Sequence, residues 1–176
     1  MTRFCVIAVL SSALMAAACG QSALPVAPSS PEAADSSSGS SVTQSVPFKG
    51  NLEGTQTVTP LQPPLGMVSG EAAGTATHLG RFTVEFPHIV NFALGQGEGT
   101  YTFRAANGDT LTADFVGQAE VGPVTSIVEE ADITGGTGRF AGASGTFTVR
   151  RTFIQSTGVT TGTFEGTLSG IGAGQS

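Results

Sequence analysis

Residues 81–92, "RFTVEFPHIVNF", alternate between two kinds of side chain. The even positions are apolar apart from His88, and most of the odd positions are polar or charged. Successive side chains of a β-strand point to opposite faces, so this period of two predicts a strand with one buried face. The same alternation recurs after Pro47, broken by Gly, Asn or Pro at intervals that suit hairpins. The sequence therefore predicts an all-β domain.

Eight such segments can be counted, at 47–59, 68–78, 80–92, 98–105, 109–120, 124–134, 145–155 and 160–171. The first and the last share the pattern G-x-apolar-E-G-T, in "GNLEGT" from Gly50 and "GTFEGT" from Gly162. Terminal strands of similar pattern favour closure of the sheet, because closure removes both exposed edges. We expect an eight-stranded antiparallel barrel, closed or nearly closed, over residues 46–172. An eight-stranded sandwich is the alternative.

The turn in "FRAANGDTLTADF" predicts the register of one hairpin. A three-residue loop over 106–108, with Gly108 left-handed, pairs Phe103 with Leu111 and Tyr101 with Ala113. This register keeps the apolar faces together, whereas a two-residue loop would place Tyr101 beside Asp114.

The pairing of segments 124–134 and 145–155 is predicted in the same way. The register that aligns their apolar faces pairs Ile133 with Phe147 and places Glu129 opposite Arg151 on the inner face, while Glu130 meets Arg150 outside. An inward arginine is costly unless it is paired and hydrogen-bonded. The pair is either a polar floor for a ligand carboxylate or oxyanion, or a structural ion pair at the barrel mouth.

The composition and the alternation argue against two classes of protein, one that binds nucleic acid and one that forms an outer-membrane barrel. The 176 residues carry a formal net charge of −6, and only 11% of them are charged. The basic residues are scattered singly apart from Arg150-Arg151, so no nucleic-acid partner is expected. An outer-membrane barrel needs an apolar outward face roughly 25 Å tall, but one face of these segments is rich in Thr and charge. We expect a soluble domain.

Residues 1–18 are typical of a secretory signal peptide, with Arg3 before an apolar run too short to span a bilayer. The stretch "AAAC" ending at Cys19 resembles a bacterial lipobox, although Ala16 stands where Leu is usual. The resemblance implies a lipid on Cys19, and Gly20 after it implies an outer-membrane lipoprotein of the cell envelope, facing periplasm or surface. Ordinary cleavage after the A-x-A pattern, with release of the chain, is the alternative.

Residues 19–45 are rich in Pro and Ser and predict a disordered tether. The only other cysteine, Cys5, lies in the signal peptide, so no disulfide or thiolate metal site is expected in the domain. The two histidines, His78 and His88, have no acidic cluster beside them in the sequence, and we predict no metal and no cofactor.

The stretch "TGGTGRFAGASG", residues 134–145, is rich in glycine. A phosphate-binding loop would lead into a helix, but the following residues alternate as a strand, and a flexible linker would not contain Phe140. We expect a structured corner between two strands, with Phe140 plugging one end of the barrel.

Within this stretch, "GGTGRFAGASG" resembles a signature of allene oxide cyclase-like and dirigent-like barrels. The resemblance covers about a dozen residues and implies an eight-stranded antiparallel barrel. Known members include plant enzymes that cyclise an epoxidised fatty acid, and dirigent proteins that orient phenoxy radicals. The aromatic-rich segment that follows the signature in the plant cyclases is missing here. Plant members often associate, which leaves a homo-oligomer open.

Four residues are candidates for a ligand site: Glu129, Arg151, His88 and Tyr101. His88 on the apolar face is either a general base or a hydrogen-bonded core residue. Tyr101 donates its hydroxyl either to a ligand or to a core carbonyl. The sequence favours an envelope-tethered barrel that binds a small hydrophobic molecule or acts as a scaffold, and whose partner is the membrane through Cys19. The alternative is an isomerase or cyclase that acts on an oxidised lipid.

Overall fold

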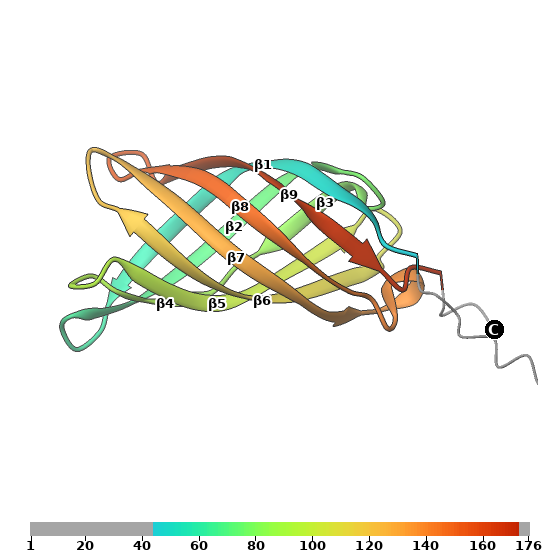
Figure 1. Ribbon diagram of the computed structural model, residues 1–176. Coiled ribbons are helices and arrows are strands. Elements are labelled where there is room, and N and C mark those ends of the chain that lie inside the picture. Colours follow the sequence, from blue (N-terminus) through green and yellow to red (C-terminus); the bar gives the residue numbers. More distant parts are fainter. Residues whose placement is uncertain (1–43, 173–176) are drawn as a thin grey trace, which may run out of the picture. The chain divides into compact units, whose positions relative to one another are not determined.

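The computed structural model describes residues 44–172 (Figure 1). The predicted signal peptide, Cys19 and nearly all of the predicted tether lie outside these residues. The described part contains nine strands and one short 3-10 helix, η1, with these bounds: β1 Val46–Pro60, β2 Leu65–Ala76, β3 Gly80–Glu85, β4 His88–Asn91, β5 Gln96–Ala105, β6 Thr110–Glu120, β7 Val124–Gly136, η1 Gly138–Phe140, β8 Ser144–Ile154 and β9 Val159–Ser169.

The strands form one closed antiparallel barrel, as the alternation predicts. β9, β8, β7, β6 and β5 follow β1 around the sheet, and the pairing of β1 with β2 closes it. β3 and β4 occupy a single position between β2 and β5. Phe86 and Pro87 interrupt this position, because a proline cannot donate to the ladder of hydrogen bonds. The barrel therefore has eight positions built from nine strands.

One of the two predicted registers is confirmed and the other is wrong. Phe103 pairs with Leu111 across the turn, and Gly108 has a φ of 92°. On β7 and β8, however, Ile133 pairs with Gly145 and Glu129 with Val149, two residues away from the predicted register.

The shift also changes the predicted contacts outside the barrel. Glu130 lies opposite Thr148, which donates hydrogen bonds to its carboxylate at 3.0 and 3.2 Å, and does not meet Arg150. Arg150 pairs with Val128 instead. The shift places the large Phe147 opposite the small Ala131, which suits the narrow interior of a small barrel.

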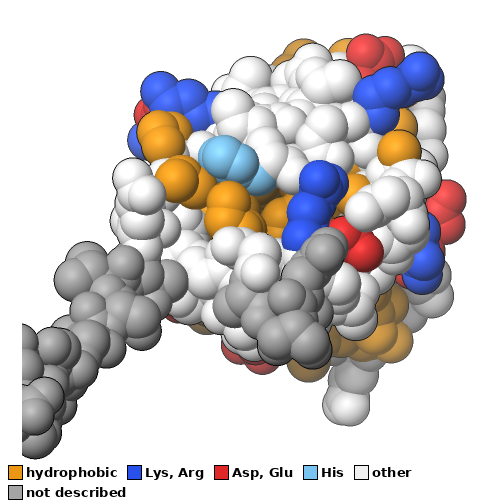
Figure 2. All heavy atoms as spheres, turned by 90° about the vertical axis from the view of Figure 1, so that its right-hand side faces the viewer, with side chains coloured by type: hydrophobic (Ala, Val, Ile, Leu, Met, Phe, Trp, Pro, Cys, Tyr) orange, Lys and Arg blue, Asp and Glu red, His pale blue; other side chains and the backbone are white. Residues whose placement is uncertain are grey.

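The two ends of the barrel differ. The closed end carries η1, the loops 77–79 and 106–109, the start of β1 and the end of β9. Phe140 in η1 is fully buried there, and Gly138 has a φ of 56°. The predicted corner and its phenylalanine plug are therefore confirmed. Figure 2 looks onto this end, where side chains of both charges lie among apolar and uncharged ones. The open end carries the loops 61–64, 92–95, 121–123 and 155–158.

Phenylalanine rings fill the half of the barrel nearest the closed end. Phe103 lies with its ring centroid 5.3–6.3 Å from those of Phe48, Phe82, Phe147 and Phe164. All of these side chains are buried, as are Phe86, Phe115 and Phe153. Phe92 shares their alternation in the sequence but lies beyond the end of β4 and is half exposed. Among residues 44–172, no helix is long and apolar enough to cross a membrane.

Candidate functional site

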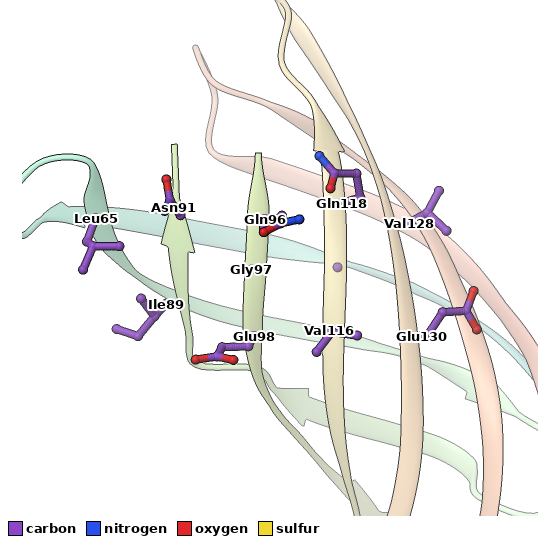
Figure 3. Close-up of a pocket in the computed structure, with 11 residues that line it drawn as sticks. Leu65, Ile89, Asn91, Gln96, Gly97, Glu98, Val116, Gln118, Val128 and Glu130 are labelled. Carbon is purple, nitrogen blue, oxygen red and sulfur yellow. The ribbon is translucent and has the colours of Figure 1, made fainter. Parts of the chain in front are cut away.

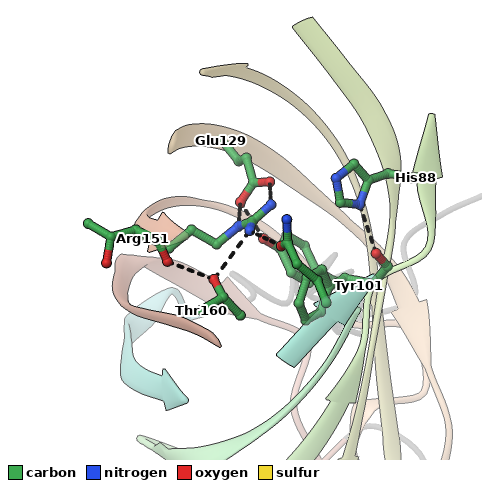
Figure 4. Close-up of polar contacts among 8 residues, drawn as sticks. His88, Tyr101, Glu129, Arg151 and Thr160 are labelled. Carbon is green, nitrogen blue, oxygen red and sulfur yellow. Dashed lines mark hydrogen bonds and ion pairs between the residues drawn. The ribbon is translucent and has the colours of Figure 1, made fainter. Parts of the chain in front are cut away.

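A polar network lies inside the barrel toward the open end (Figure 4). It joins Glu129 on β7 to Arg151 on β8, although the two residues are not directly opposite each other. Residues on the same face of neighbouring strands, offset by two, lie roughly 7–8 Å apart, which long side chains can bridge. The side chains of Arg151 and Glu129 are only 1% and 2% exposed. The predicted inward ion pair is therefore present, on a diagonal.

Arg151 donates four hydrogen bonds in this network. Nε reaches Glu129 Oε2 at 2.9 Å, and Nη2 reaches Glu129 Oε1 at 2.6 Å, which makes a bidentate pair. Nη1 donates to Gln56 Oε1 at 2.6 Å and to Thr160 Oγ1 at 3.3 Å. Burial disfavours the charged guanidinium, but its hydrogen bonds to Glu129 and the charge of that carboxylate outweigh burial and raise the pKa of Arg151. The positive charge of Arg151 is therefore balanced by the negative charge of Glu129.

Tyr101 on β5 completes the carboxylate's set of partners. Its hydroxyl donates to Glu129 Oε2 at 2.5 Å, and the side chain is fully buried. Burial and the neighbouring charge of Glu129 raise the pKa of Tyr101 well above 10.0, so the hydroxyl keeps its proton. The sequence predicts a ligand or a core carbonyl as the acceptor of this hydroxyl. The acceptor in the structure is neither of these but the Glu129 carboxylate.

His88 at the start of β4 lies across the interior from the ion pair (Figure 4). Its Nδ1 is 2.9 Å from the carbonyl oxygen of Phe86, and its ring lies between those of Phe86 and Phe115, with centroids 6.2 and 5.5 Å away. Burial lowers the pKa of His88 below 6.5 despite the hydrogen bond to Phe86, so the ring is neutral at pH 7. The other histidine, His78, lies in the exposed turn at the closed end with a φ of 65°.

Three inward polar residues of the site lie opposite a glycine. Glu129 pairs with Gly117, Arg151 with Gly162 and His88 with Gly99. A Cβ atom at Gly117 would lie 2.7 Å from Glu129 Cγ, and one at Gly162 would lie 2.5 Å from Arg151 Cβ. Glycine on the neighbouring strand therefore makes room for the large polar side chain inside the barrel.

Above the network, the interior opens into a pocket of about 100 Å³. Val58, Val68, Val90, Ile127 and Phe153 form apolar walls, and Gln56, His88, Glu129 and Arg151 also line it. The predicted candidates thus converge on one pocket, with Tyr101 directly beneath it through its bond to Glu129. Within residues 44–172, no three His, Cys, Asp or Glu side chains gather as metal ligands would.

Exposed apolar side chains gather at the open end of the barrel, and we call them the apolar rim: Val58, Leu61, Leu65, Met67, Phe92, Leu94, Val121, Val124 and Ile154. Of these, Val58, Phe92 and Val121 line the pocket itself. The four loops at this end, 61–64, 92–95, 121–123 and 155–158, contain no charged residue. A single exposed Leu or Val is ordinary, but apolar residues gathered around one opening mark a surface that contacts something apolar.

A second depression lies on the outer wall of the barrel and is open to solvent (Figure 3). It is larger, about 690 Å³, and runs across β4, β5, β6 and β7 between residues such as Ile89, Val116 and Glu130. Its charged side chains, Glu98 and Glu130, are both acidic and exposed. Since no buried polar group converges on it, the interior pocket is the stronger candidate site.

Two residues of the network, Gln56 on β1 and Thr160 on β9, were missed by reasoning from the sequence. Both are buried and both bond to Arg151. Each follows the inward alternation of its strand, after Phe48 and Leu52 on β1 and before Phe164 on β9. A polar residue at an inward position was the signal, the same one that singled out Arg151.

The sequence was compared with protein-family models and with curated proteins. No protein-family model matches the chain, and no curated protein sequence matches it either. The barrel itself is therefore established by the structure alone.

Proposed function

We propose that this protein binds one small, neutral, hydrophobic molecule in the open-end pocket. The observation that carries the proposal is an apolar-walled pocket of about 100 Å³ that opens through the apolar rim. Small-molecule sites are mostly apolar concavities with a few convergent polar groups. An engineered apolar cavity of about 150 Å³ holds benzene, so a ring of that size, partly emerging through the rim, matches the space.

The ion pair favours a neutral ligand over a charged one. Arg151 already has the Glu129 carboxylate in bidentate contact, and that carboxylate also accepts from Tyr101. A ligand carboxylate would bring a second negative charge beside Glu129 without an uncommitted cation to meet it. For the same reason, a cyclase that uses Arg151 to stabilise an oxyanion is the weaker candidate: the guanidinium is already neutralised.

The proposal places the barrel at the bacterial cell envelope, held by a lipid on Cys19 and a tether. Its support is the sequence around Cys19 and the Pro- and Ser-rich residues that follow. The "GGTGRFAGASG" stretch and the closed barrel support a relationship to the allene oxide cyclase-like and dirigent-like barrels as a fold, without their chemistry.

Binding is tested on the full chain with two probes of similar size, toluene and benzoate, by ligand-observed NMR. We expect toluene to bind and to compete with larger apolar molecules, and benzoate to bind at least tenfold more weakly. Benzoate binding as tight as toluene would overturn the neutral-ligand proposal, and no binding of toluene would overturn ligand binding in the pocket.

The envelope location has its own measurement, native mass spectrometry of the protein purified from membranes. It reports acylation of Cys19, the number of subunits and any retained small molecule together. A mature mass that matches an unmodified Cys19 would rule out the anchor.

A further inference from the structure

Among residues 44–172, the second ring nitrogen of His88 has no hydrogen-bond partner, although the side chain is buried and lines the pocket. The Nδ1 of His88 faces the Phe86 carbonyl, and a carbonyl oxygen can only accept a hydrogen bond. Nδ1 therefore carries the hydrogen of the neutral imidazole. Nε2 is then left with a lone pair, which makes it a hydrogen-bond acceptor.

Among the described residues, neither Tyr101 nor Arg151 donates a hydrogen bond to this acceptor. Tyr101 gives its single hydroxyl hydrogen to Glu129. Arg151 directs four of its five N–H hydrogens to Glu129, Gln56 and Thr160. In Figure 4 the second ring nitrogen of His88 points toward the side of the interior where Arg151 and Glu129 lie. His88 itself lines the pocket.

We propose that His88 Nε2 accepts a hydrogen bond from the ligand, so that the pocket selects neutral molecules that join a small apolar body to an O–H or N–H donor, such as an alcohol or a phenol. This inference rests on the proposed ligand-binding function and narrows its ligand class. A donor is required because a ligand carbonyl or ether oxygen facing Nε2 would oppose one lone pair to another.

Gln56 makes a hydroxyl the best fit among such donors. Arg151 can only donate, so the oxygen of the Gln56 amide must face it, and the amide nitrogen is left as a donor on the pocket wall. A hydroxyl can donate to His88 and also accept from an amide. An apolar body alone would leave both groups unsatisfied.

The experiment compares three probes of nearly equal size on the full chain at pH 7.5: toluene, phenol and anisole. A hydroxyl buried without a partner loses roughly 5- to 150-fold in affinity. We expect phenol to bind at least as tightly as toluene to the natural chain, and anisole to bind more weakly than phenol because it lacks the donor. In the His88→Phe variant, the affinity of phenol relative to toluene should fall about tenfold.

His78→Asn is the matched control, since it removes the exposed histidine at the other end and Asn tolerates a positive φ. The ratio of the two affinities should stay within about twofold in this control. An NMR measurement on the natural chain guards against misfolding of His88→Phe: the ¹⁵N resonance of His88 Nε2 should shift with phenol and not with toluene.

The outcomes separate the two levels of the proposal. If toluene binds but phenol is no better in the natural chain than in His88→Phe, or anisole equals phenol, the His88 inference fails and the ligand-binding function stands. If none of the probes binds, the ligand-binding function fails and the inference with it.

Discussion

The two halves of the barrel are filled by different chemistry, and only one of them retains a pocket. Toward η1, rings such as Phe103 and Phe147 interlock with centroids 5.9 Å apart, and Phe140 seals the end. Toward the open end, the Arg151–Glu129 pair occupies the interior. Apolar side chains interdigitate until few voids remain, whereas a hydrogen-bonded network holds its members at positions fixed by bond geometry. The open half therefore keeps space that the closed half has lost.

The largest effect is expected from opening the closed half. Phe103→Ala removes a fully buried ring that neighbours five other aromatic rings, and should lower the free energy of unfolding by about 3–5 kcal/mol. Chemical denaturation measures the loss. Phe92→Ala in the apolar rim is the control, because that ring is half exposed and should cost about 1 kcal/mol or less. Equal losses would show that the closed half is not close-packed.

In the open half, Arg151→Met should lower the free energy of unfolding by about 3 kcal/mol or more. The substitution leaves the Glu129 carboxylate buried without its counter-charge. The exposed neighbour Arg150 points the other way, and Arg150→Met should change stability by less than about 0.5 kcal/mol.

A second substitution isolates the ion pair itself. Adding Glu129→Leu to Arg151→Met should recover part of the loss, because no uncompensated charge then remains. Denaturation midpoints of the three variants decide the matter: if Arg151→Met is as mild as Arg150→Met, water reaches the network and the contrast between the halves disappears.

The contrast between the halves was only partly predictable from the sequence. The barrel, its closure and the Phe140 plug follow from local patterns, namely a period of two, turn glycines and matching first and last strands. The β7–β8 register does not, because matching apolar with apolar treats Ile133 and Ala131 as equivalent partners for Phe147. In the folded barrel, the size of the side chains determines the register, and the large Phe147 ring lies opposite the small Ala131.

The network was predictable in its centre and not at its edges. Glu129 and Arg151 stand out because charge on an inward face needs a partner. Gln56 and Thr160 carry the weaker signal of a neutral polar residue at an inward position, and their role depends on where the Arg151 side chain ends, which local patterns do not specify. The glycines opposite Glu129 and Arg151 are a further signal, which can be read once the register is known.

A smaller effect is expected at Tyr101, which joins the two halves. Tyr101→Phe removes one hydrogen bond to a charged acceptor and should cost about 1.5–3 kcal/mol. Because the folded pKa of Tyr101 is raised, stability is retained up to pH 10 and falls above it, where the unfolded tyrosine ionises and the buried one does not. Tyr101 is the only tyrosine, so Tyr101→Phe should remove this alkaline decline. A decline that persists in the variant would contradict the buried hydroxyl.

The smallest effect concerns His88 and appears on the acid side. Burial lowers the pKa of His88, so below pH 6.5 the unfolded chain takes up a proton that the native ring refuses. The free energy of unfolding should therefore fall as the pH decreases from about 7.5 toward 5, whereas His88→Phe should lack this part of the decline. Denaturation curves of the two proteins across that range give the difference, in which the common contribution of the carboxylates cancels.

The control for this prediction again sets one half of the barrel against the other. His78 at the closed end is exposed, so His78→Asn should leave the acid decline in place. The charged and titratable side chains that face His88 are Glu129 from β7, Arg151 from β8 and Tyr101 from β5. The negative charge of Glu129 favours the protonated ring, and the positive charge of Arg151 opposes it. Tyr101 is neutral over this pH range. If the difference between the natural chain and His88→Phe does not change with pH, the ring is hydrated, and the open half then offers a ligand an acceptor already bound to water.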